Sequence, residues 1–335
     1  MTPVELSRTV LHAVRRAVDE GELRVVPPEK VLVAPPGPGG CGDYATNVAL
    51  QLARPAGQPP QRVAEILRPR LLRAPGISDV VVTGPGFINI SLVGAEGPVG
   101  LVREILRCGA RYGHGDALDG RTVRLRPARE VRAVVQVEAL VRILRSQGAV
   151  VHVDDHDGID DHDGIDDHDG VVVRPVPAPA DPARLGPDAA RWALLHPAPH
   201  DRPRIGDEHL VQRESNPLFR VRYAHARTRA LLRNAADLGF GPEPGPVDGA
   251  RSLLRALADH PRVLVAAATH RAPDRLARQL VAVADAVPPL LPAVLPLGGE
   301  KPSAAHRARL ALADAAGTVL AGGLSLLGID APDHL

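Results

Sequence analysis

The stretch from Glu214 to Asn234 constrains the fold of this chain most, because one predicted helix there carries two apolar stripes. Asn216 can accept hydrogen bonds from the free amides of a first turn, and Pro217 suits the first helical position. At 100° per residue the two stripes contain Phe219, Tyr223, Ala226 and Ala230, and Leu218, Val221, His225, Thr228 and Leu232. A helix with two apolar stripes is expected to pack against layers on both sides.

Within this helix, N-P-L-F-R-V-R-Y-A-H-A-R resembles the segment that opens the anticodon-binding domain of arginyl-tRNA synthetases. Two earlier segments, G-D-Y-A-T-N-V-A-L-Q-L-A and G-P-G-F-I-N-I-S-L, resemble the N-terminal accessory domain of that family in order and spacing. The ending A-G-G-L-S-L-L-G-I-D-A-P-D-H-L also resembles the family, although its usual final acid-Arg-Met is replaced by Asp333, His334 and Leu335. The resemblance covers nearly everything except residues 154–183.

The patterns predict an α+β multidomain chain. The resemblance implies its parts: a small N-terminal α/β domain that grips the tRNA elbow (1–110), a remnant βαβ unit of a Rossmann-like catalytic domain (111–153), a linker (154–183) and a C-terminal all-α anticodon-binding bundle (184–335). A length of 335 residues with 44% hydrophobic side chains supports two or three modest cores.

In the N-terminal part we expect a helix to about Asp19, a strand at 31–33, a helix over 44–53 capped by Asp43, and a helix with Val63, Ile66 and Leu67 inward. Strands follow at 80–82 and 87–92. The glycine-rich loop from Gly37 to Gly42 could cradle a phosphate, but it lacks an ordered G-x-G-x-x-G pattern, so a plain connecting loop is favoured.

Residues 122–126, 131–147 and 149–153 predict strand, helix and strand, with Gly148 as the helix C-cap. This unit resembles the first βαβ of the family's nucleotide-binding domain, where a His-x-Gly-His loop holds the ATP phosphates. Here that loop is P-A-R-E, and the only lysines, Lys30 and Lys301, lie far from it in sequence. ATP is therefore expected as a cofactor only if ligase activity remains.

The linker contains D-D-H-D-G-I-D-D-H-D-G-I-D-D-H-D-G up to Gly170, followed by a proline-rich spacer. Its Asp and His side chains could collect a divalent metal, but no Glu closes an EF-hand frame, so a low-complexity linker is favoured. The C-terminal bundle is expected to contain helices at 250–259, 262–269, 273–287 and 303–320, the last of them capped by Ser303. The segment L-G-P-D-A-A-R-W-A-L-L (185–195) before them resembles the family helix that follows its second ATP loop.

The resemblance implies that Phe87 and Asn89 present an aromatic ring and an amide to a base of the tRNA D-loop. The alternative is that Phe87 is a core residue and Asn89 a satisfied strand residue. On the anticodon side the candidate residues are Arg222, Tyr223, His225, Arg227 and Arg229. For these the alternatives are a packed histidine, a buried ring and a solvated arginine face. No catalytic residue and no metal ligand is assigned.

We expect a non-catalytic paralogue of arginyl-tRNA synthetases that binds tRNA, specifically tRNA(Arg), with a tRNA-modifying enzyme or a synthetase as a possible partner. The alternatives are a shortened ATP-dependent arginine-tRNA ligase and a protein-interaction module. Only Cys41 and Cys108 are present, and free thiols fit a reducing cytosol. The charged N-terminal helix and the absence of an apolar run of membrane-spanning length favour a cytoplasmic protein without a membrane partner.

Overall fold

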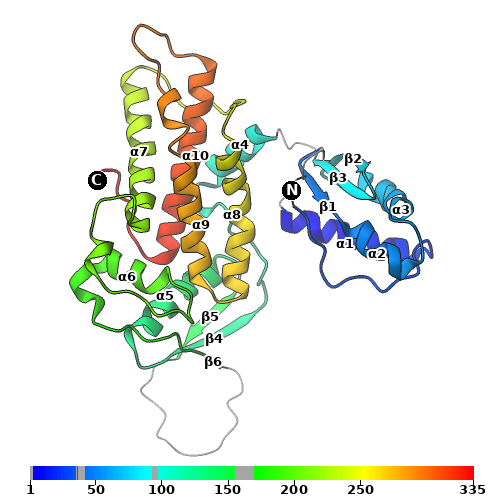
Figure 1. Ribbon diagram of the computed structural model, residues 1–335, viewed down its shortest axis with the longest axis horizontal. Helices are drawn as coiled ribbons and strands as arrows, with labels where there is room; N and C mark the ends of the chain where they lie inside the picture. Colours follow the sequence, from blue (N-terminus) through cyan, green and yellow to red (C-terminus); the bar gives the residue numbers. More distant parts are fainter. Residues whose placement is uncertain (1–2, 35, 37–41, 93–96, 155–169) are drawn as a thin grey trace, which may run out of the picture. The chain divides into compact units, whose positions relative to one another are not determined.

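The computed structural model describes residues 3–34, 36, 42–92, 97–154 and 170–335. They form two compact units, one up to Leu101 and one from Val102 to Leu335, each with its own core (Figure 1). The glycine-rich loop, apart from Gly42, and the Asp/His repeat lie outside the described residues, so their phosphate, metal and linker hypotheses stay predictions. Cys41 is also outside, and Cys108 is a free thiol.

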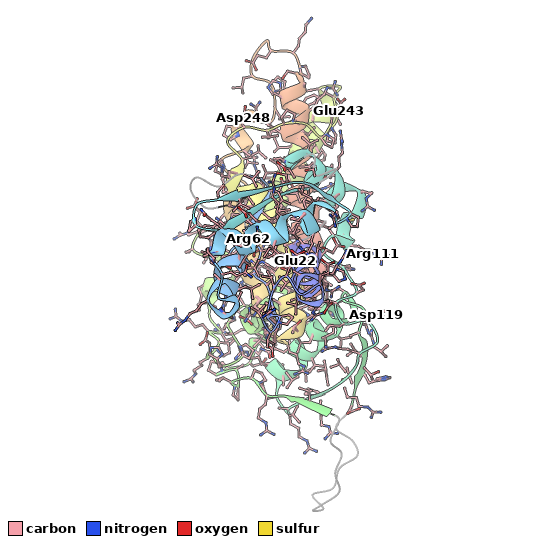
Figure 2. The ribbon with its side chains drawn as sticks, turned by 90° about the vertical axis from the view of Figure 1, so that its right-hand side faces the viewer. Glu22, Arg62, Arg111, Asp119, Glu243 and Asp248 are labelled. Atoms are coloured by element: carbon pink, nitrogen blue, oxygen red, sulfur yellow. The ribbon has the colours of Figure 1, made fainter. Side chains whose placement is uncertain are left out.

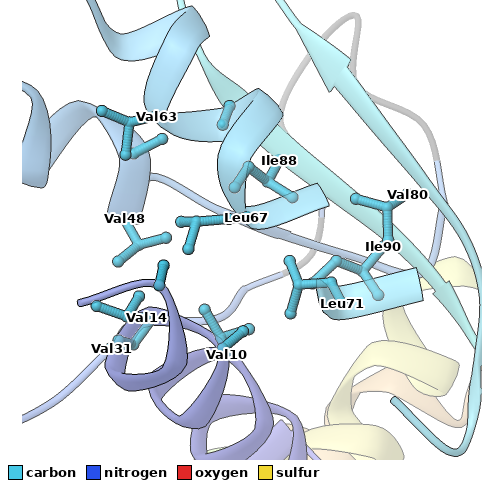
Figure 3. Close-up of a cluster of buried hydrophobic side chains, with 14 of the residues drawn as sticks. Val10, Val14, Val31, Val48, Val63, Leu67, Leu71, Val80, Ile88 and Ile90 are labelled. Carbon is cyan, nitrogen blue, oxygen red and sulfur yellow. The ribbon is translucent and has the colours of Figure 1, made fainter. Parts of the chain in front are cut away.

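The first unit packs helices on one face of a small antiparallel sheet with strand order β1-β3-β2. Its elements are α1 (Pro3–Asp19), β1 (Tyr44–Thr46), α2 (Val48–Ala56), α3 (Pro60–Leu72), β2 (Ile77–Thr83), β3 (Phe87–Leu92) and the start of α4 (Pro98–Cys108). Figure 3 shows the core between them, in which Val14, Leu67 and Ile88 are fully buried. At the edge of this core, Glu22 (Figure 2) pairs with the buried Arg70 at 2.8 Å.

Two local predictions in this unit are wrong. Tyr44–Thr46 forms a strand paired with β3, and the helix begins only at Val48. Asp43 does not cap that helix, because its carboxylate accepts a hydrogen bond from Leu92 N at 2.9 Å. Residues 31–33 keep alternating burial but form no strand, since only Ala34 bridges to Ala45.

The second unit begins with a parallel sheet of order β5-β4-β6. Its first elements are η1 (Gly109–Arg111), β4 (Thr122–Pro127), α5 (Val131–Arg145), β5 (Val150–Val153), β6 (Gly170–Val173) and η2 (Pro182–Leu185). The βαβ unit is confirmed, but part of the predicted linker is a third strand, β6, beside β4. Helix α5 ends with Ser146 as its C-cap, and Gly148 lies beyond it with φ 86°.

The rest of the unit is helical: α6 (Pro187–Leu195), η3 (Asp207–His209), α7 (Pro217–Asp237), α8 (Arg251–Thr269), α9 (Pro273–Ala286), η4 (Leu291–Ala293) and α10 (Ala304–Leu327). Helices α7 to α10 lie side by side (Figure 1), and α7 packs mainly against α10 and α9. The caps expected at Asn216 and Ser303 are confirmed, because each side chain accepts a backbone N–H. The predicted second layer over the Phe219–Tyr223 stripe is found only in part, since Tyr223 stays 44% exposed.

Residues 251–269 form one helix, not the two that were predicted around Pro261. Proline removes one N–H from a helix and frees the carbonyl four residues earlier, which here belongs to Leu257. That carbonyl accepts a hydrogen bond from the Tyr112 hydroxyl at 3.2 Å, so the helix continues without an unsatisfied buried group.

Helix α10 extends seven residues beyond its predicted end and corrects the expectation about apolar runs. It is long and apolar enough to cross a membrane by length and composition, but 72% of the relevant window is buried inside the fold. It packs against α7, α9, η1, α5, α8 and α6, so it is the central helix of the bundle.

Candidate nucleic-acid interface

Phe87 and Asn89 lie on the same face of β3 but in different surroundings. Phe87 follows the turn at Gly84–Gly86 and its ring is 42% exposed, so it is not a core residue. Asn89 is 2% exposed and donates from Nδ2 to Thr83 Oγ1 at 2.7 Å and to Val81 O at 3.2 Å. Phe87 therefore leaves aromatic surface open to solvent, whereas Asn89 is a satisfied strand residue.

Three of the five candidate residues on α7 are bound within the fold. Arg222 forms an ion pair with Asp188 of α6 at 3.0 Å. Arg229 lies between Asp333 at 3.3 Å and Asp314 at 3.7 Å.

His225 is 4% exposed, and its Nδ1 lies 3.1 Å from Pro332 O. Burial lowers the pKa of His225, so the imidazole is neutral at pH 7 and acts as a packing residue.

Tyr223 and Arg227 remain available on one face of α7, one turn apart. The Tyr223 ring stacks on Phe219 at 5.5 Å between centroids, and the residue is 44% exposed. Arg227 is exposed and makes no hydrogen bond or ion pair with the described residues. This pair offers an aromatic surface and an unneutralised guanidinium, which are the groups that hold single-stranded RNA.

Arg227 also stands at a small pocket of about 200 Å³ between α7 and the segment after α9. The lining residues are Arg227, Ala230, Leu231, Asn234, Leu291, Pro292, Leu295 and Leu297. Apolar walls with one guanidinium and one amide can surround a flat base and bond its edge. Sequence reasoning missed Asn234, although its spacing of seven from Arg227 places it on the same helix face.

The loop between β4 and α5 has the chemistry of a helix cap. The Glu130 carboxylate accepts hydrogen bonds from Ala133 N at 2.8 Å and Arg132 N at 3.0 Å. These first-turn amides are the donors that a phosphate would need at a helix N-terminus, and a carboxylate already occupies them. Among the described residues no group of three or more His, Cys, Asp or Glu side chains could hold a metal ion.

Arg132, one residue inside the same helix, is completely buried. Its guanidinium donates to the carbonyls of Leu194, Val176, Asp201, Pro197 and Ala198 at 2.7 to 3.0 Å. Arg132 therefore fixes the segments on either side of α6 to the first turn of α5. Sequence reasoning missed this role, because no local pattern indicates which of the arginines becomes buried.

Comparison with known families gives two matches. The arginyl tRNA synthetase N terminal domain matches residues 5–92, and the DALR anticodon binding domain matches residues 221–335. Together they cover more than half of the chain. Phe87 and Asn89 fall in the first match, and Tyr223 and Arg227 in the second.

Curated relatives are arginine–tRNA ligases. The Renibacterium salmoninarum protein is 38% identical over 165 residues, which are 45% of this chain and 30% of the relative. The Frankia alni protein is 44% identical over 126 residues, which are 37% of this chain and 22% of the relative. The alignments thus span less than a third of the length of either relative.

Solved structures share the fold at low identity. Arginyl-tRNA synthetase from Thermus thermophilus matches with a TM-score of 0.68 and 16% identity, and that from Plasmodium falciparum with 0.65 and 9%. Both matches cover 100% of this chain and 100% of the other. With its two domain matches and its ligase relatives, the chain belongs to the arginyl-tRNA synthetase family.

Proposed function

We propose that this protein binds tRNA, with tRNA(Arg) preferred, and does not activate arginine. The observation that carries the proposal is the exposed Tyr223–Arg227 face of α7 beside an apolar pocket, within the match to the anticodon-binding domain. The exposed Phe87 ring in the N-terminal domain gives a second contact with an unpaired base. Two separate contacts on one tRNA increase affinity through effective concentration.

The absence of arginine activation is supported by the loop before α5. Triphosphate chemistry needs preorganised donors and cations on the phosphates. Here the first-turn amides bond Glu130, and the loop contains neither His nor Lys. In this proposal the protein works in the cytoplasm and without ATP. It passes its bound tRNA to a tRNA-modifying enzyme or a synthetase.

The test is binding of the purified chain to total cellular tRNA across a salt series, followed by sequencing of the retained tRNA. Stacking and edge contacts are worth about 1–3 kcal/mol per base, so Tyr223→Ala and Arg227→Ala should each weaken binding about tenfold. Arg275→Ala is the matched control, because Arg275 is exposed on α9 and has no partner among the described residues. A chain that binds no tRNA, or that loses equal affinity in all three variants, contradicts the proposal.

The second candidate is an arginine-tRNA ligase, which is the activity in the names of the curated relatives. It predicts arginine-dependent exchange of pyrophosphate into ATP in the presence of tRNA. Exchange above a no-arginine control would replace the non-catalytic proposal. Binding of tRNA without any exchange would support the non-catalytic proposal.

A further inference from the structure

A groove of about 570 Å³ runs along α5 beside the edge strand β5. Its lining residues are Pro127, Ala128, Arg129, Val134, Val137, Glu138, Val141, Arg142, Arg145 and Val153. None of them belongs to the proposed tRNA contacts. From the geometry of this groove we infer that it docks an amphipathic helix of a partner protein whose apolar stripe is flanked by carboxylates.

The apolar floor of the groove points to a protein ligand. Val134 and Val153 are each 43% exposed, and Val131, one turn before Val134, is 47% exposed. Val134 and Val153 line the same groove from neighbouring elements, so its floor exposes apolar surface of the kind that soluble proteins usually cover. RNA would gain little from such a floor, because it has no aromatic ring and its valines cannot stack on bases.

The position of the groove explains why it is open. Strand β5 pairs only with β4 among the described strands, so it is an edge strand. All-parallel sheets are normally covered by helices on both faces, and a neighbouring crossover helix would pack beside α5. Apart from α5, no described helix contributes a residue to the lining of the groove, so an added helix would cover its open side.

The charged side chains at the rim of the groove indicate which charge the partner should carry. Arg129 is exposed and makes no hydrogen bond or ion pair with the described residues. Arg145 donates only to the Val151 carbonyl, at 3.3 Å, and keeps its charge unneutralised. The single acidic residue, Glu138, is already paired with Arg191. The rim is thus cationic, and carboxylates on both sides of an apolar stripe would complement it.

The length of the groove sets the size of the partner segment. The α5 residues that line the groove run from Val134 to Arg145, so at 1.5 Å per residue the groove presents about 17 Å, or about three turns. A partner helix of that length carries apolar side chains at i, i+3, i+4 and i+7, the pattern of helices that bind in grooves.

The experiment uses a fluorescent 15-residue peptide with leucines in that pattern and glutamates on both sides of them. Binding to the full chain is measured by fluorescence anisotropy at several salt concentrations. A scrambled peptide of the same composition and a peptide with lysine for glutamate are the comparison ligands. We expect the striped acidic peptide to bind at least tenfold more tightly than either, with an affinity that falls as salt rises.

Two variants locate the binding. Val134→Asp places a carboxylate in the floor, and the double variant Arg129→Glu, Arg145→Glu reverses the rim; each should weaken binding at least tenfold. Val172→Asp is the matched control, because Val172 is 47% exposed on β6 of the same sheet and does not line the groove. Circular dichroism and thermal unfolding establish that each variant folds, and valine-methyl NMR shifts at Val134 and Val153 report the contact directly.

Three results would overturn the inference. The first is equal peptide affinity in Val134→Asp and Val172→Asp. The second is concentration-dependent self-association that Val134→Asp abolishes, which would make a second copy of the chain the occupant. The third is tRNA binding lost in the rim variant, which would assign the groove to RNA. Because peptide and tRNA binding are measured separately, failure of one proposal is distinguishable from failure of the other.

Discussion

Arg132 of α5 is hydrogen-bonded to Val176, to Leu194 of α6 and to the segment after α6. Its five hydrogen bonds go to carbonyls from Val176 to Asp201, and all five distances are 3.0 Å or less. A planar guanidinium can satisfy all of these acceptors at once, whereas an ammonium has three donors. Burial lowers the pKa of Arg132 from its usual value, but an arginine stays protonated, so the carbonyls are what balance the charge.

We therefore expect Arg132→Lys to lower the free energy of unfolding by about 3 kcal/mol or more, because carbonyls are left unsatisfied around a buried charge. Urea denaturation measures the change as a lower midpoint at constant slope. Arg129→Lys, three residues away and exposed, is the control and should change stability by less than about 0.5 kcal/mol. Equal midpoints for the two variants would show that the carbonyl cluster contributes nothing.

The buried imidazole of His260 should make the free energy of unfolding depend on pH. It is completely buried in α8, and burial, helped by nearby His114, lowers its pKa from 6.5 to about 4. Below pH 6.5 the imidazole of His260 becomes protonated in the unfolded chain, whereas in the folded chain it stays neutral until about pH 4. Stability is therefore complete above pH 6.5 and falls between pH 6.5 and 4, by on the order of 3 kcal/mol for this group.

His260→Gln should flatten that part of the pH profile, measured as urea midpoints at pH 7, 6, 5 and 4.5. Some slope will remain, because burial also lowers the pKa of His196, whose ring stacks on that of Trp192, to about 4. His200→Gln, at a side chain 84% exposed, should leave the profile unchanged. A variant profile as steep as that of the wild type would remove His260 from this account.

The sequence identified Tyr223 and Arg227 from one helical motif, and both are exposed in the structure. Sequence reasoning could not distinguish Arg227 from Arg222 and Arg229, which are arginines of the same helix. The difference is made by Asp188 and the aspartates near the chain's end, which lie far away in sequence. Helix periodicity gives the face of a side chain, and tertiary contacts decide whether its charge is free.

At the scale of elements, local patterns predicted helices and strands well where the segment is long and its burial regular. They failed where a distant partner supplies a missing bond. Pro261 suggested a helix break, but the hydroxyl of Tyr112 satisfies the carbonyl that proline leaves free. Residues 44–46 suggested a helix, but pairing with β3 draws them into the sheet. Strand β6 was missed because a repeat precedes it and only four residues form it.

The first turn of α5 supplies the prediction at this scale. Glu130 caps two amides, so Glu130→Ala should cost about 1 kcal/mol of unfolding free energy. The freed amides can then donate hydrogen bonds to an anion, so phosphate should stabilise the variant in thermal unfolding but not the wild type. Glu214→Ala, at an exposed glutamate without a partner among the described residues, is the control. Phosphate stabilisation of the wild type would contradict the capped state of this helix.

On the scale of the whole molecule, the chain divides at Leu101 into two units with separate cores. The first core is built only from residues 6–92, and its centre includes Leu67 and Ile88, both fully buried. The bundle has a core of its own, in which Leu280 and Leu320 are fully buried. Cooperativity follows shared burial, so each unit should unfold as its own cooperative transition.

Calorimetry of the full chain should therefore show two transitions, which variants can assign. Leu67→Ala leaves a cavity in the first core and should lower one transition only, by about 2–5 kcal/mol. Leu280→Ala, an equal truncation in the bundle, is its counterpart and should lower only the other. If either variant moves both transitions together, the two units share their stability and the division at Leu101 is not a folding boundary. If each moves one, the tRNA contacts that we propose at Phe87 and at Tyr223 belong to separately stable parts, and a variant in one cannot act by unfolding the other.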